Sequence, residues 1–156
     1  MFRMVHILML FSVLGACQNH HEVVFEEHFN GTTLNMAVWN YELGDGCPSL
    51  CGWGNDERQH YTIDNASIKD GELVISATYS DSVYNSSRIT TKNKIEFQYG
   101  IVEVRAKLPN GHGVWPAIWM LGNDIETNSW PACGEIDIME YVGKKPGMIH
   151  TSLHTP

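Results

Sequence analysis

A strict alternation of apolar and charged side chains between residues 102 and 108 is the feature that most constrains how this chain folds. Successive side chains of a β-strand point to opposite faces, so the alternation predicts a half-buried strand. The segment Pro109-Asn110-Gly111 is a turn signal that ends it. The apolar face consists of Val102, Val104, Ala106 and Leu108, and the charged face of Glu103, Arg105 and Lys107.

Two further runs favour strands. Residues 72–79 follow an Asp70-Gly71 turn and are rich in β-branched and aromatic side chains, and in residues 135–140 isoleucines alternate with carboxylates. After the first 16 residues, apolar side chains nowhere recur at helical spacing over ten or more positions. Short strands separated by Gly, Pro and Asn predict an all-β sandwich or barrel.

The charge balance limits the partners. The chain has 156 residues, with 18 acidic and 10 basic side chains and a net charge of -8. This length predicts one domain with a sizeable core. Nucleic acid is excluded as a partner, because phosphate binding needs a surplus of Lys and Arg.

The first 16 residues have the pattern of a secretory signal peptide, with Arg3 ahead of an apolar run over residues 7–14. The run is too short to span a membrane, which takes about 20 apolar residues. Leu14-Gly15-Ala16-Cys17 resembles a bacterial lipobox, which predicts lipidation of Cys17 and a mature domain over residues 17–156. The protein is then exported and touches the membrane of the bacterial cell envelope only through a lipid anchor. The alternative is an ordinary signal peptide and a periplasmic or secreted protein.

Cys47 and Cys51 are close enough in sequence to bridge a tight loop, and an oxidising compartment permits the bond. The alternative is half of a zinc site, although no second cysteine pair or well-spaced histidine pair completes one. Cys133 is left unpaired.

Three acidic residues dominate the run at 135–140. Glu135 and Asp137 are two positions apart and share a strand face, but Glu140 is five positions from Glu135 and would point to the other face of a regular strand. A one-residue bulge near Met139 restores the phase and brings all three acids together. Carboxylates packed on one face repel each other, so their pKa values should differ. One group then stays protonated and can act as an acid, while an ionised one can act as a nucleophile. The alternative is a solvated polar face.

Other residues point to a sugar-binding cleft. Sugars offer C–H faces to aromatic rings, and they offer hydroxyl groups to amides, Arg and carboxylates. The residues of these types that have no evident core role are Asn55, Arg88, Trp115 and Trp119.

The string Gly134-Glu-Ile-Asp-Ile-Met-Glu-Tyr-Val-Gly143 resembles the active-site signature of glycoside hydrolase family 16 in its bulged, laminarinase-type form. The resemblance covers residues 23 to 154 in order. The other similar segments are Phe29-Asn30-Gly31 with Leu34 and Trp39, residues 52–59 with Tyr61-Thr62, residues 87–92, Tyr99-Gly100 with Glu103 and Arg105, and residues 113–121.

The resemblance implies a concanavalin A-like β-jelly-roll sandwich of two curved antiparallel sheets, with the cleft on the concave face. Domains of this family continue through several more strands, so we expect residues 17–156 to be an incomplete domain. His28 stands where many relatives have an acidic residue, in a region that can contribute to a structural calcium site. Calcium prefers oxygen ligands, so neither a metal nor a cofactor is predicted.

The resemblance also implies roles at the matching positions. Glu135 resembles the nucleophile, Glu140 the general acid/base, and Asp137 the residue that holds and tunes the nucleophile. Retention requires the two working carboxyls about 5 to 5.5 Å apart. The implied substrate-binding residues are Asn55 and Arg88 as hydrogen-bonding groups, Trp115 and Trp119 as sugar platforms with core packing as the alternative, and His154 beside the catalytic strand.

The expected protein is a monomeric, retaining endo-β-1,3-glucanase that acts on laminarin-type polysaccharide. One alternative is a hydrolase of the same family that acts on another β-glucan or an algal galactan. The other is a non-catalytic β-glucan-binding protein on the same fold. Binding-only relatives typically lose the catalytic glutamates, so Glu135 and Glu140 favour the enzyme.

Overall fold

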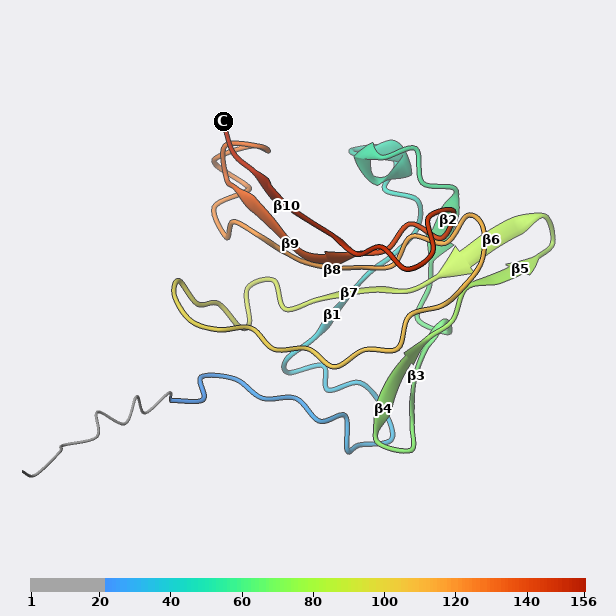
Figure 1. Ribbon diagram of the computed structural model, residues 1–156, viewed down its shortest axis with the longest axis horizontal. Helices are drawn as coiled ribbons and strands as arrows, with labels where there is room; N and C mark the ends of the chain where they lie inside the picture. The colour runs from blue at the N-terminus through green and yellow to red at the C-terminus, as the bar shows by residue number, and fades with distance from the viewer. Residues whose placement is uncertain (1–21) are drawn as a thin grey trace, which may run out of the picture.

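The computed structural model describes residues 22–156, which form ten strands and one short 3-10 helix (Figure 1). The predicted signal peptide and Cys17 lie outside the described residues. In the described part of the chain, no helix has the length and apolar character needed to cross a membrane. The prediction of an all-β protein is confirmed.

The helix η1 spans Cys51–Gly54. The strands are β1 Asn40–Glu42, β2 Gln59–Tyr61, β3 Ala66–Lys69, β4 Glu72–Ile75, β5 Thr78–Ser80, β6 Val83–Ser86, β7 Arg88–Thr90, β8 Ala117–Leu121, β9 Glu135–Glu140 and β10 His150–His154.

The strands pair in four groups. The largest contains β10, β9 and β8 in that order, all antiparallel. A second three-stranded group has the order β2-β6-β5, in which β2 is parallel to β6. Two pairs complete the set, β1 with β7 and β3 with β4. The predicted acidic strand is β9, the central strand of its group.

The run predicted as a strand over 72–79 forms two strands with different partners. β4 pairs with β3 across a turn in which Asp70 and Gly71 have φ values of 52° and 75°. β5 instead pairs with β6. Asn65 fixes the break between them, because its side-chain amide donates to Ser76 O at 2.8 Å and to Thr78 Oγ1 at 3.1 Å.

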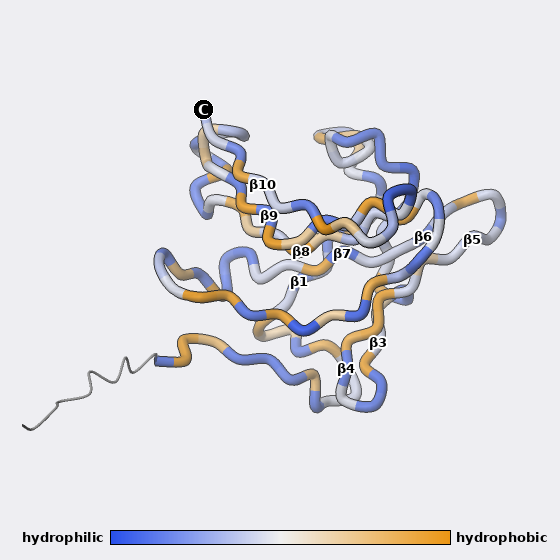
Figure 2. The backbone as a smooth tube through the Cα atoms, viewed as in Figure 1, coloured by the Kyte–Doolittle hydropathy of each residue, from blue (hydrophilic) through white to orange (hydrophobic). Residues whose placement is uncertain are grey.

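The strand predicted over 102–108 is not formed in the described part of the chain. Figure 2 shows this stretch alternating between hydrophobic and hydrophilic colours, as the sequence requires. No described segment pairs with its backbone, however, and Val104 is 51% exposed. The prediction of a half-buried strand is therefore wrong, because a strand also needs a neighbour that accepts and donates its backbone hydrogen bonds.

Apolar burial is concentrated in few side chains. Leu34 and Tyr141 are the buried hydrophobic residues among those described, at 8% and 5% exposure. Asp137 is as deeply buried as Tyr141, which follows directly after β9 in the chain. The best-packed part of the described chain therefore includes the acidic strand.

A disulfide joins Cys47 and Cys51, with the two sulfur atoms 2.07 Å apart. The bridge was predicted from the spacing, and it leaves neither thiol for the alternative zinc site. Cys133 is free and half-buried.

Candidate active site

The central strand β9 contains the predicted bulge. Ile118 of β8 is opposite Met139, but the next residue, Trp119, is opposite Asp137. Ile138 therefore has no partner on β8. The register with β10 shifts at the same place, between His150 and Ser152. The bulge is therefore at Ile138, next to Met139, and affects the pairing with both neighbouring strands.

The bulge brings the third acid onto the face of the other two. Ser152 is opposite Asp137 in the register and shares its face. The Ser152 hydroxyl donates to Glu140 Oε2 at 3.5 Å, so Glu140 faces the same side. His154 is opposite Glu135 and lies two residues beyond Ser152. The predicted grouping of Glu135, Asp137 and Glu140 on one face is therefore present.

The Glu135 carboxyl is bound by a side chain from the loop that precedes β9. The indole N–H of Trp130 donates to Glu135 Oε2 at 2.7 Å. Burial raises the pKa of Glu135, and the nearby charge of Asp137 raises it further. The hydrogen bond from Trp130 and the charge of His154 act in the opposite direction, but the net effect is a raised pKa.

Asp137 and His154 form a pair close to Glu135. His154 Nε2 lies 3.0 Å from Asp137 Oδ2, and the Asp137 side chain is only 6% exposed. One ligand-type atom from each of Glu135, Asp137 and His154 lies within 4.8 Å of the other two. Such a set could bind a metal ion. The hydrogen bonds and charges within the site account for the close approach without one.

Glu140 has an indole partner of its own. Trp115 Nε1 donates to Glu140 Oε1 at 3.0 Å, and the Trp115 side chain is half exposed. Trp115 precedes β8 rather than lying on it, so the spacing of four residues between Trp115 and Trp119 does not put both on one strand. Both tryptophans nevertheless lie beside the acidic strand, because Trp119 is opposite Asp137 in the register.

Arg88 contacts two indole rings. Its guanidinium carbon is 4.5 Å from the centre of the Trp53 ring and 4.9 Å from that of Trp119. Its Nε also forms an ion pair with Glu42 Oε2. Arg88 therefore connects η1 and β1 to the sheet of β8, β9 and β10, and its guanidinium lies over the Trp119 ring.

Asn55 directly follows η1 and belongs to a hydrogen-bonded cluster around Glu57. Asn55 Nδ2 donates to Glu57 Oε1 at 3.4 Å, while Glu57 Oε2 accepts from Tyr61 Oη at 2.6 Å and from Gln59 Nε2 at 2.8 Å. Burial first, and then Glu57, raise the pKa of Tyr61 to about 12. The Tyr61 hydroxyl therefore remains a neutral donor at physiological pH. Tyr61 also packs on Trp53, so this cluster supports the ring beneath Arg88.

The sequence did not reveal Trp130, Ser152 or Glu42 as members of the site. Trp130 lies five residues before Glu135 in a loop, and strand periodicity says nothing about a loop. An aromatic residue close to an acidic run was the only signal. Ser152 could be found only once the register of β10 was known.

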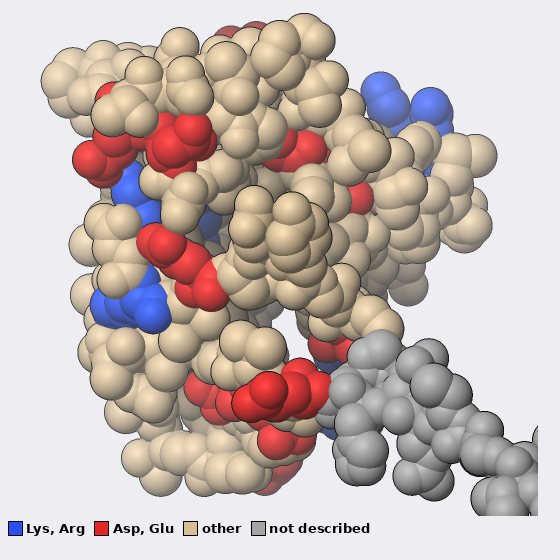
Figure 3. All heavy atoms as spheres, turned by 90° about the vertical axis from the view of Figure 1, so that its left-hand side faces the viewer, with Lys and Arg blue, Asp and Glu red and all other residues tan. Residues whose placement is uncertain are grey.

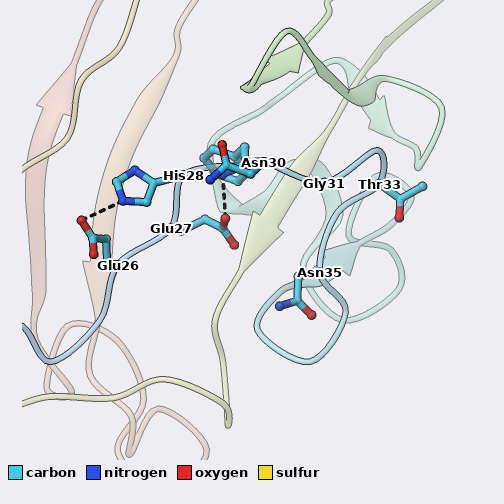
Figure 4. Close-up of a pocket in the computed structure, with 8 residues that line it drawn as sticks. Glu26, Glu27, His28, Asn30, Gly31, Thr33 and Asn35 are labelled. Atoms are coloured by element: carbon cyan, nitrogen blue, oxygen red, sulfur yellow. Dashed lines mark hydrogen bonds and ion pairs between the residues drawn. The ribbon is translucent and has the colours of Figure 1, made fainter.

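A separate pocket of about 350 Å³ is lined by residues near the N-terminal end of the described chain and contains none of the predicted site residues (Figure 4). It includes His28, whose Nε2 lies 2.7 Å from Glu26 Oε1. Glu27 accepts from the Phe29 amide and from the Trp39 indole. The two carboxylates thus have partners within the protein.

The chain is similar to several known proteins. Residues 54–156 match the family model "Glycosyl hydrolases family 16". The chain is 43% identical over 147 residues to glucan endo-1,3-beta-glucosidase A1 of Niallia circulans, covering 85% of this chain and 22% of that protein. It is 39% identical over 165 residues to a beta-glucanase of Rhodothermus marinus, covering 97% of this chain and 56% of that protein.

The structure also superimposes on the crystal structure of the laminarinase from Flavobacterium sp. UMI-01 with a TM-score of 0.83 and 61% sequence identity. The superposition covers 85% of this chain and 57% of that one. The chain thus spans less than two thirds of each of these three proteins. The likeness confirms the predicted jelly-roll fold class.

Proposed function

The chain belongs to glycosyl hydrolases family 16, and from this membership we propose that the protein hydrolyses internal linkages of β-1,3-glucan with retention of anomeric configuration. One observation carries the proposal. The bulge at Ile138 turns Glu140 onto the face of Glu135 and Asp137. A retaining mechanism needs an acid and a nucleophile that face the same glycosidic bond.

In the first step, Glu140 gives its proton to the departing glycosidic oxygen as a carboxylate oxygen of Glu135 attacks the anomeric carbon. The bond between that carbon and the departing oxygen breaks, and its electron pair leaves with the oxygen. The chain end beyond the cleavage site departs as a free sugar hydroxyl. A glycosyl ester on Glu135 remains.

In the second step, Glu140 is ionised and removes a proton from a water molecule, which attacks the same carbon. The ester bond breaks, Glu135 becomes a carboxylate again, and Glu140 regains its proton. Two inversions at one carbon give net retention. The hydrogen bonds from Trp115 and Ser152 hold the Glu140 carboxyl while it alternates between these states.

The polysaccharide would lie over the acidic face. Trp115 offers a half-exposed ring beside Glu140, and a sugar can stack its C–H face there. Arg88 and Asn55 would donate hydrogen bonds to hydroxyl groups. Acidic side chains gather at several places on the face seen in Figure 3, whereas Lys and Arg are few there. The net charge of -8 suits a neutral glucan better than a sulfated galactan.

The test is the hydrolysis of laminarin, with the first-formed anomer identified by proton NMR. Glu135→Gln and Glu140→Gln should each lower kcat by about a thousandfold or more while the fold is retained. A matched control is Glu126→Gln, which alters an exposed carboxyl that is paired with Lys92 and takes no part in either chemical step. An inverted first product would refute the mechanism, and laminarin binding without cleavage would favour the glucan-binding alternative.

We also propose that the protein is exported and anchored through a lipid on Cys17, and that it acts as a monomer without a cofactor. The lipobox-like string at residues 14–17 supports the anchor. The disulfide between Cys47 and Cys51 fits an oxidising compartment outside the cytoplasm.

A further inference from the structure

We propose that Trp130 is a positioning residue of the hydrolysis, which rests on the proposed function: its indole N–H holds the carboxylate of Glu135 while its ring packs against His154. Trp130 thus contacts two of the three residues in the group of Glu135, Asp137 and His154. No role in the reaction was predicted for Trp130 from the sequence.

The contact geometry is specific. Trp130 Nε1 lies 2.7 Å from Glu135 Oε2, a short distance for a nitrogen donor and typical of a charged acceptor. The Trp130 ring centre is 5.7 Å from that of His154, whose Nε2 lies 3.0 Å from Asp137 Oδ2. Trp130 is itself 54% exposed, so it does not serve as a core side chain. The residues that hold Trp130 in place are Glu135 and His154, both members of the site.

An indole nitrogen can only donate, so it favours the ionised form of the carboxylate that accepts. The other groups that face Glu135 are Asp137 on its own strand, His154 on β10 and the uncharged Leu121 on β8. The negative charge of Asp137 opposes ionisation of Glu135. The hydrogen bond from Trp130 acts against that charge, so Glu135 stays ionised down to a lower pH than it would without Trp130.

The donor also fixes the orientation of the nucleophile. A carboxylate can rotate about its last bond, and attack needs one oxygen directed at the anomeric carbon. Because Trp130 holds Oε2, rotation of the group is restricted. Removal of the indole N–H should therefore lower kcat as well as move the pH dependence.

The chain offers matched comparisons, because two other indoles also donate to glutamates. Trp115 binds Glu140, and Trp39 binds Glu27 Oε2 at 3.2 Å away from the acidic face. Replacement by Phe removes the N–H and keeps a ring at each position. The series Trp130→Phe, Trp115→Phe and Trp39→Phe removes the same bond at three different carboxylates.

We expect Trp130→Phe to lower kcat about 10- to 100-fold, with little change in KM, as the loss of one hydrogen bond to a charged group implies. The acidic limb of kcat/KM should move to higher pH. Trp115→Phe should lower activity without moving that limb, and Trp39→Phe should leave activity unchanged. Trp130→His retains a ring N–H and should recover part of the limb position. Thermal melts verify that each variant folds.

A carbon-13 NMR titration of the Glu135 carboxyl gives a readout that needs no activity. Its pKa should rise in Trp130→Phe and stay in place in Trp115→Phe and Trp39→Phe. An unchanged Glu135 titration in folded Trp130→Phe would overturn the inference, as would an equal shift in Trp115→Phe. A wild-type protein that fails to cleave laminarin would instead refute the proposed function. The titration would still show whether the Trp130 N–H lowers the pKa of Glu135.

Discussion

The guanidinium carbon of Arg88 lies 4.9 Å from the centre of the Trp119 ring and 4.5 Å from the centre of the Trp53 ring. With Glu42 at its Nε, the Arg88 side chain is only 20% exposed. A planar guanidinium can stack on two rings and bind a carboxylate at once, whereas the ammonium group of lysine cannot.

Arg88→Lys should therefore lower the free energy of unfolding by about 1 to 3 kcal/mol, because two cation–π contacts and an ion pair are weakened. Urea denaturation would measure this loss. Arg105→Lys is the matched control, since Arg105 is 92% exposed and its ion pair with Glu72 is 3.6 Å long. That change should cost less than about 0.5 kcal/mol. An equal loss of unfolding free energy in both variants would contradict the stabilising role of the two Arg88 cation–π contacts.

Glu135→Gln should raise the thermal stability at pH 7. The pKa of Glu135 is raised in the folded protein by burial and by Asp137, so its ionised form opposes folding. The stability contribution of the protonated group is present below the ordinary pKa of a glutamate and is lost as the pH rises through the folded value. Thermal melts should thus show a gain at pH 7 and none at pH 3.

A control with the opposite sign is Glu126→Gln. The hydrogen bond and charge of Lys92 lower the pKa of Glu126, so its ionised form favours folding above the ordinary glutamate pKa. Its replacement should not raise the melting temperature at pH 7. A similar gain in both variants would indicate a general effect of lower net charge.

Asp137→Asn should move the acidic limb of kcat/KM to lower pH, because the charge of Asp137 raises the pKa of Glu135. The same change removes an acceptor from His154, so kcat should fall by about tenfold or more. A pH–rate profile with laminarin separates the two effects. A limb that moves upward would contradict the sign derived from the charge.

Cys17→Ser should release the protein from the cell envelope or block removal of the signal peptide. Mass spectrometry of the mature N-terminus should find an acylated cysteine in the wild type. The control is Cys133→Ser, which alters a free thiol in the folded domain and should leave the protein anchored. An unmodified N-terminus at another residue would refute the lipid anchor.

The sequence allowed the acidic face and its bulge to be predicted because both follow from the two-residue period of a strand. An acid five positions from another can share its face only if one residue drops out of phase, as Ile138 does. The contacts of Arg88 with Trp53 and Trp119 could not be predicted, because they join η1, β7 and β8 across long sequence separations. The strand expected at 102–108 shows the converse limit, since side-chain alternation cannot supply a backbone partner.

The bulge has a consequence for the tolerance of this strand to length changes. In an unbulged strand, three acids share a face at positions i, i+2 and i+4, whereas here they occupy i, i+2 and i+5. Deleting Ile138 would therefore convert one arrangement into the other and leave the three carboxyls on the same side. Deleting Ile136 would instead place Glu135 and Asp137 next to each other on opposite faces. The strand can thus lose one residue between Asp137 and Glu140 and keep the parity of its acids, but it cannot lose the residue between Glu135 and Asp137.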